Sequence, residues 1–122
     1  MKMQIDKQVK SLIITVTPAK SPIKDIVGFA ELQLIDEWEN TLFIVRGYTI
    51  RVKVFNNTPM FIVSAPAFRS GLNFKQSFIV EDKSFWHIIS GKIVDEFREL
   101  TGDKKPEDYI SNEDIDPKSI PF

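Results

Sequence analysis

Five basic side chains in the middle of the chain have the types and spacing that binding to an anionic polymer requires. No acidic residue lies between Glu39 and Glu81, and the cations of this stretch are Arg46, Arg51, Lys53, Arg69 and Lys75. Alternate residues of a strand lie roughly 6.5–7 Å apart on one face. That spacing is close to the phosphate repeat of a nucleic acid, so several contacts can form at once. Tyr48 and Phe68 add aromatic faces on which bases can stack.

The same cations have a second interpretation. Basic side chains on an exposed sheet face also serve solvation, protect a sheet edge, or pair with a carboxylate across strands, and Glu31 is a candidate for such a pair. The formal net charge of the whole chain is −1, whereas general polyanion binders are usually basic. Composition alone therefore leaves both interpretations open.

Groups suited to catalysis or metal binding are scarce. The one histidine, His87, has no second ligand at metal-binding spacing, and the chain contains no Cys. The five glycines are scattered rather than grouped in a phosphate-binding loop, and no serine lies in a G-x-S-x-G motif. We therefore expect a protein that is not an enzyme and that uses no metal or cofactor.

The N-terminal stretch MKMQIDKQVK lacks the apolar core of a signal peptide. No apolar run approaches the roughly 18–20 residues that cross a bilayer, and the lack of Cys suits a reducing compartment. We expect a cytoplasmic protein with no membrane contact.

Alternation of apolar and polar residues predicts strands at about residues 9–17, 26–35, 42–55, 60–65 and 74–80. Pro18 and Pro22 bracket a predicted turn, and residues 66–73 are predicted to form a loop. Because the connections are short, the strands should pair antiparallel.

In the long strand at 42–55, the alternation of apolar and polar residues changes phase partway along. Regular pairing would place Arg46 on the same face as the apolar Ile50, which would bury an arginine. A one-residue bulge at Gly47–Tyr48 resolves the conflict, since glycine within a strand pattern often marks a bulge. The bulge is predicted to keep Arg46 outward, beside Arg51 and Lys53.

One amphipathic helix should follow the strands. Asp82 is a suitable N-cap, Gly102 is a suitable residue to end the helix, and the apolar stripe between them is Trp86, Ile89, Ile93, Phe97 and Leu100. The sequence thus predicts an α+β domain over residues 1–102, in which an antiparallel sheet of about five strands packs on one C-terminal helix. Residues 103–122, with six acidic and three basic side chains, form a predicted acidic tail.

The order of these segments resembles a known family. LFIVRGYTIRV, a turn, MFIVSAPAFR, FKQSFIV and a helix ending in DEFREL are similar to the pattern of the stage V sporulation protein G (SpoVG, septation protein) family. Pro66 and Arg69 match the family's F-V-x-M-P-S-K-R element, and Phe74-Lys75 matches its aromatic-basic strand. Ala67 and Phe68 depart from it, as do the acid-rich helix end and the tail.

The resemblance implies a small dimeric α+β protein that binds DNA or RNA as a regulator, with Arg69 and Lys75 as the best-matched basic residues. The leading prediction is therefore a homodimeric nucleic-acid-binding regulator that uses the cationic sheet face. The alternative is a protein-interaction module without nucleic acid, with the acidic tail as a docking peptide. A second subunit is also expected, because one helix can cover only one face of the sheet. The apolar residues predicted to lie on the other face are Ile13, Phe29, Phe61 and Val63.

Overall fold

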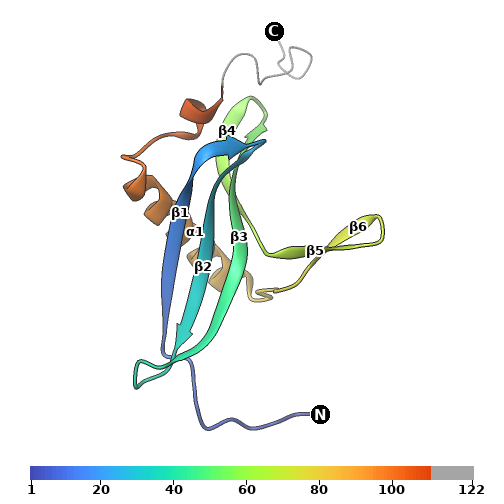
Figure 1. The fold of residues 1–122 in the computed structure, drawn as a ribbon, viewed down its shortest axis with the longest axis vertical. Coiled ribbons are helices and arrows are strands. Elements are labelled where there is room, and N and C mark those ends of the chain that lie inside the picture. Colours follow the sequence, from blue (N-terminus) through green and yellow to red (C-terminus); the bar gives the residue numbers. More distant parts are fainter. Residues whose placement is uncertain (111–122) are drawn as a thin grey trace.

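The computed structural model describes residues 1–110, and the fold is an α+β arrangement of antiparallel strands and one long helix (Figure 1). Four strands form a sheet in the order β1-β2-β3-β4. They are β1 (Ser11–Ile23), β2 (Ile26–Ile35), β3 (Thr41–Phe55) and β4 (Thr58–Ser64). A separate pair, β5 (Ala67–Ser70) and β6 (Asn73–Gln76), precedes α1 (Lys83–Leu100) and the short 3-10 helix η1 (Pro106–Tyr109).

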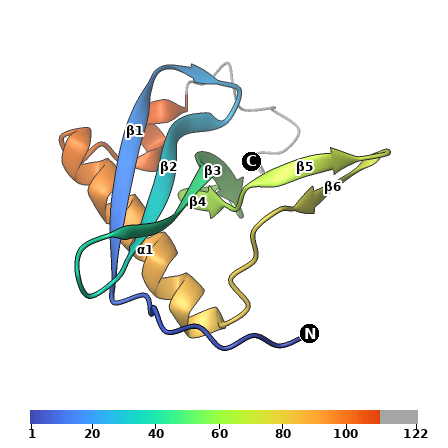
Figure 2. The same cartoon turned by 60° about the horizontal axis from the view of Figure 1, so that its bottom comes forward.

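The predicted class, α+β with antiparallel pairing, is confirmed, but two local predictions are wrong. Residues 66–73 and 74–80 are not a loop followed by a fifth sheet strand, because they contain a two-stranded hairpin of their own. The hairpin extends away from the sheet in both views (Figure 1, Figure 2). The predicted turn at Pro18–Pro22 lies within β1, where proline is tolerated because β1 is an edge strand.

The predicted bulge in β3 is confirmed. Tyr48 pairs with Ala30 and Arg46 pairs with Glu31, so Gly47 is the extra residue between them. Its φ of +102° lies in the region that favours glycine. A Cβ added to Gly47 would meet the Cβ of Pro66 at 3.2 Å. The bulge therefore sits directly against the residue at which the chain leaves the sheet for the hairpin.

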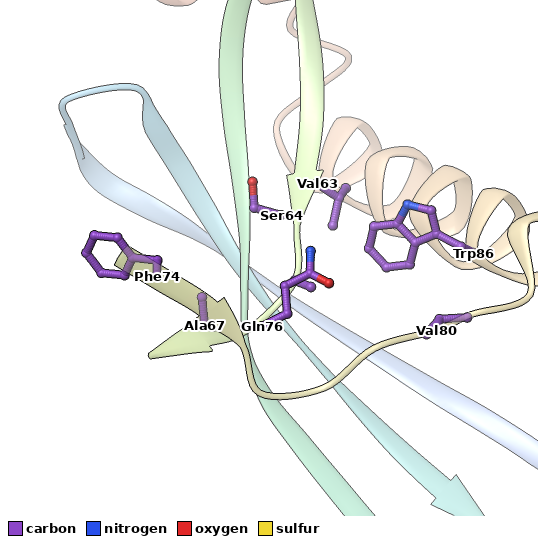
Figure 3. Close-up of a pocket in the computed structure, with 8 residues that line it drawn as sticks. Val63, Ser64, Ala67, Phe74, Gln76, Val80 and Trp86 are labelled. Atoms are coloured by element: carbon purple, nitrogen blue, oxygen red, sulfur yellow. The ribbon is translucent and has the colours of Figure 1, made fainter. Parts of the chain in front are cut away.

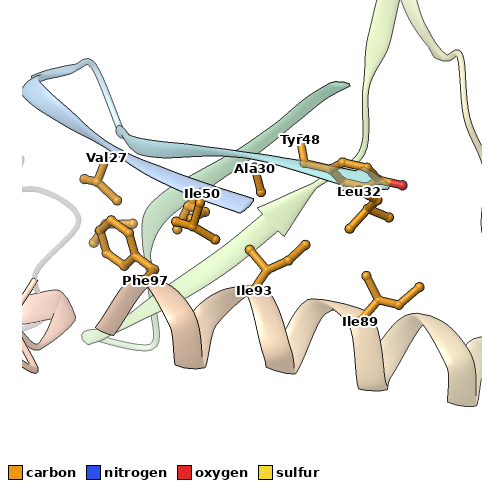
Figure 4. Packing of buried hydrophobic residues seen from close by; sticks show 10 residues of the cluster. Val27, Ala30, Leu32, Tyr48, Ile50, Ile89, Ile93 and Phe97 are labelled. Carbon is orange, nitrogen blue, oxygen red and sulfur yellow. The ribbon is translucent and has the colours of Figure 1, made fainter. Parts of the chain in front are cut away.

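Helix α1 covers one face of the sheet and closes the core (Figure 4). Ile89, Ile93 and Phe97 are buried at its centre. The prediction that Phe61 lies away from the helix is wrong, because its ring packs edge-on against Phe97 at 5.3 Å. Val63 likewise packs against this core. In the sheet Phe61 lies opposite Val52 and Val63 lies opposite Ile50, so both side chains face the helix as their partners do.

Ile13 and Phe29 lie on the sheet face opposite the helix, as predicted, and both are exposed in the single chain.

Both predicted ends of the helix are confirmed. The Asp82 carboxylate accepts a hydrogen bond from the backbone N–H of Phe85 at 2.9 Å. At the other end, Gly102 has a φ of +70°, and the N–H of Asp103 donates to the carbonyl of Arg98 at 2.6 Å. This is the hydrogen-bond pattern of a Schellman motif, in which a left-handed residue ends the helix.

The first residues of the predicted acidic tail belong to the packed domain. Tyr109, in η1, contacts Phe61 at 5.9 Å and Phe97 at 6.0 Å between ring centroids. Residues 111–122, which carry the rest of the predicted tail, lie outside the described residues. Within residues 1–110, no helix combines the length and apolar character that a bilayer crossing needs.

Candidate nucleic-acid interface

The five predicted cations fall into two groups. Arg46, Arg51 and Lys53 lie on the face of β3 that points away from the helix, because their neighbours Tyr48, Ile50 and Val52 are buried beneath α1. Arg69 lies on β5 and Lys75 on β6, in the projecting hairpin. The structure thus brings three of the predicted residues together on the sheet and places two on a separate arm.

Every cation of the β3 group has a carboxylate partner from the β2 side. Arg46 Nε contacts Glu31 Oε2 at 2.9 Å, which confirms the pair considered as the second interpretation. Arg51 Nη1 contacts Asp25 Oδ1 at 2.6 Å, and Lys53 Nζ contacts Asp25 Oδ2 at 2.9 Å. Glu31 lies in β2 and Asp25 in the turn that precedes it, so the outer face of β3 is a set of ion pairs rather than an uncompensated positive stripe.

Asp25 belongs to this set of ion pairs, although the sequence did not indicate it. It follows Lys24 in the tight turn between β1 and β2, and its backbone carbonyl accepts a hydrogen bond from Val52 N–H at 2.9 Å. Partial burial raises the pKa of the Asp25 carboxyl, but the hydrogen bonds and charges of Lys53 and Arg51 outweigh burial and hold the pKa below 3.8. Asp25 is therefore ionised at neutral pH and offsets part of the cationic charge.

The hairpin carries its cations without such compensation. Among residues 1–110, neither Arg69 nor Lys75 forms an ion pair, and Arg69 Nε donates instead to the Gly71 carbonyl at 3.1 Å. The hairpin register pairs Phe68 with Lys75 and Arg69 with Phe74. Because directly opposed residues project from the same face of a hairpin, each face of this arm presents one cation beside one aromatic ring.

The rings of the hairpin are open to solvent. Phe68 is 50% exposed and Phe74 75% exposed, and Leu72 at the tip is 93% exposed. Phe68 thus meets the condition for base stacking. Phe74 was not among the predicted site residues, although its position next to Lys75 in the alternating stretch 73–76 could have indicated it.

The prediction that Tyr48 offers a face for stacking is wrong. Its side chain is fully buried, and its ring stacks on Trp86 with centroids 6.1 Å apart. The bulge at Gly47 explains this, because the residue that follows it faces the helix. Burial raises the pKa of the Tyr48 hydroxyl above 10.0, and that hydroxyl has no hydrogen-bond partner within the described part of the chain.

A cavity of about 470 Å³ lies where the hairpin meets the body (Figure 3). Gln76 and Phe74 of the hairpin, Val63 and Ser64 of β4, and Trp86 of the helix contribute to its walls. The walls combine the rings of Phe74 and Trp86 with the amide of Gln76 and the hydroxyl of Ser64. In residues 1–110, no three His, Asp or Glu side chains lie close enough together to hold a metal ion.

No family model, curated protein or solved structure matches this chain. The resemblance to the SpoVG family therefore stays a prediction, and the geometry of the site is what supports a function.

Proposed function

We propose that this chain is a small cytoplasmic nucleic-acid-binding regulator, of the kind the SpoVG resemblance implies, which holds DNA or RNA without altering it chemically. The observation that carries the proposal is the hairpin β5–β6, in which each face presents an exposed aromatic ring next to a cation that has no ion-pair partner among residues 1–110. Cations can contact phosphates, and rings can stack on bases, which is the combination used by proteins that bind single strands.

The shape of the arm supports the same proposal. The hairpin extends from the body in both views (Figure 1, Figure 2), and a two-stranded β-ribbon also fits the major groove of B-DNA. In this account Arg69, Lys75 and Phe68 make the first contacts. A smaller contribution to binding is expected from Arg46, Arg51 and Lys53, because each already pairs with a carboxylate of the protein itself.

Titration of fluorescently labelled single-stranded DNA, duplex DNA and RNA at low ionic strength tests the proposal. Binding of at least one of these probes is expected, with an affinity that falls steeply as salt is added. If none of them binds at low salt, the proposal is wrong.

A protein-interaction module is the second candidate. Phe68, Leu72 and Phe74 form an exposed apolar set on the hairpin, and exposed apolar patches commonly mark protein interfaces. A complex that survives nuclease and high salt would favour this candidate. The role predicted for the acidic tail as a docking peptide falls mainly on residues 111–122, outside the described residues.

We also propose that the chain forms a homodimer. Strand β4 pairs only with Thr49–Phe55, so the edge of β3 below the bulge has no neighbouring strand among residues 1–110. Phe43 and Ile44 are exposed there, and they border an apolar hollow of about 500 Å³ that also includes Pro66. An open apolar edge recruits another strand, and an antiparallel pairing of two such edges satisfies two-fold symmetry.

Light scattering tests the dimer directly. The expected mass is twice that of one chain, and Phe43→Glu should shift it toward the single-chain mass, because the charge would be buried in the interface. A single-chain mass for the wild-type protein would refute this proposal without touching nucleic-acid binding.

A further inference from the structure

The Asp25 carboxylate bridges two of the proposed nucleic-acid-binding cations. One carboxylate oxygen faces Arg51 at 2.6 Å and the other faces Lys53 at 2.9 Å. An anion held between a guanidinium and an ammonium in this way has the geometry of a phosphate contact, in which two oxygens of one group accept from two donors. The pair is thus an anion site that the protein's own carboxylate fills.

We propose that Arg51 and Lys53 form a phosphate-binding seat, and that Asp25 closes it in the free protein so that a nucleic-acid phosphate has to displace the carboxylate. The inference rests on the proposed function and adds to it the residue that limits affinity on the sheet face.

Opening the seat requires only a side-chain movement. The backbone of the Asp25 turn is held separately, because its carbonyl accepts the Val52 N–H at 2.9 Å. The side chains of the three residues are 27%, 31% and 48% exposed for Asp25, Arg51 and Lys53. A phosphate can therefore approach from solvent, and the carboxylate can rotate away without disturbing the sheet.

The charges explain why the seat affects affinity. With Asp25 in place the trio carries one net positive charge, and removal of the carboxylate charge leaves two cations with no partner. Glu31 plays a weaker part on the same face, because Arg46 remains 74% exposed beside it. Asp25 should therefore be the carboxylate whose neutralisation changes binding most.

Four proteins test the seat. They are the wild type, Asp25→Asn, Asp25→Asn combined with Arg51→Gln and Lys53→Gln, and Asp95→Asn as a control with the same charge change on the exposed face of the helix. Asparagine keeps the size of the side chain and can still accept from Arg51, and urea unfolding of each variant verifies that it is folded. The probes are labelled 20-nucleotide single-stranded DNA, the matching duplex and the matching RNA, titrated across ionic strength.

Asp25→Asn is expected to bind about tenfold more tightly at low salt. Its log–log salt dependence on duplex should steepen by about 0.9 for each additional phosphate that the variant neutralises. The triple variant should bind no more tightly than the wild type, and Asp95→Asn should stay within about twofold of the wild type.

An unchanged affinity for Asp25→Asn, an equal increase for Asp95→Asn, or an increase that survives in the triple variant would each overturn the seat while leaving the hairpin proposal intact. Absence of binding by all four proteins would overturn both.

Discussion

Substitution of Gly47 by alanine should destabilise the protein by about 1–3 kcal/mol. This range is the usual cost of holding a residue with a side chain in a sparsely populated backbone region, and Gly47 has a φ of +102°. The added Cβ would also lie 3.2 Å from the Cβ of Pro66, a contact that requires a shift of a few tenths of an ångström. The loss should therefore fall in the upper part of the range.

Gly91→Ala provides the matched control. Gly91 lies within helix α1, and nothing lies within 4 Å of a Cβ added there. Alanine should increase the free energy of unfolding by roughly 0.5–1 kcal/mol, since glycine is a poor helix former. Urea unfolding followed by circular dichroism measures both variants. A Gly47→Ala protein as stable as the wild type would contradict the account of the bulge that positions Arg46.

Two further substitutions test the core and the helix end. Tyr48→Phe should raise the free energy of unfolding by about 1 kcal/mol, because it removes a buried hydroxyl that has no hydrogen-bond partner among residues 1–110; a clear loss of stability in urea unfolding would mean that the hydroxyl is satisfied. Asp82→Ala should destabilise the helix at neutral pH, because it removes the hydrogen bonds that the Asp82 carboxylate accepts from the Ser84 hydroxyl and the Phe85 N–H. The same two hydrogen bonds hold the pKa of Asp82 below 3.8. Such a lowered pKa gives stability that is present above about pH 4 and lost as pH falls through the folded pKa. The difference between wild type and Asp82→Ala should therefore shrink on acidification, and a gap that stays constant down to about pH 2 would refute the capping role.

The sequence allowed prediction of those parts of the fold that depend on local periodicity. The alternation in β2 and β3, the apolar stripe of α1 and the capping residues Asp82 and Gly102 all follow from residue type and spacing. The bulge at Gly47 was predictable as well, because regular pairing would have buried Arg46.

The position of the hairpin was not predictable in this way. Alternation in residues 73–76 is the same whether the strand joins the main sheet or pairs only with β5. Residue type and spacing do not show that the chain leaves the main sheet near Pro66 and that β6 pairs with β5 alone.

The sequence predicted which basic residues the candidate site contains, but it did not predict which carboxylates pair with Arg51 and Lys53. The outward placement of Arg46, Arg51 and Lys53 followed from strand parity. Tyr48 lies two residues before the buried Ile50, so the same alternation would have indicated that Tyr48 is also buried. The ion pairs of Asp25 with Arg51 and Lys53 could not be predicted without the register between β2 and β3. That register places the turn that contains Asp25 beside Arg51, which lies 26 positions further along the chain.

The salt dependence of binding by the hairpin tests the central claim most directly. Arg69→Gln combined with Lys75→Gln is compared with Lys83→Gln combined with Lys92→Gln, which removes two exposed helix cations instead. With the probe that the wild type binds most tightly, the account predicts that the hairpin variant binds more weakly and that its log–log salt slope falls for each phosphate that is no longer neutralised, by about 0.9 on duplex DNA or about 0.7 on a single strand, whereas the helix variant binds like the wild type. Equal affinities and slopes for the wild type and the hairpin variant would contradict the account.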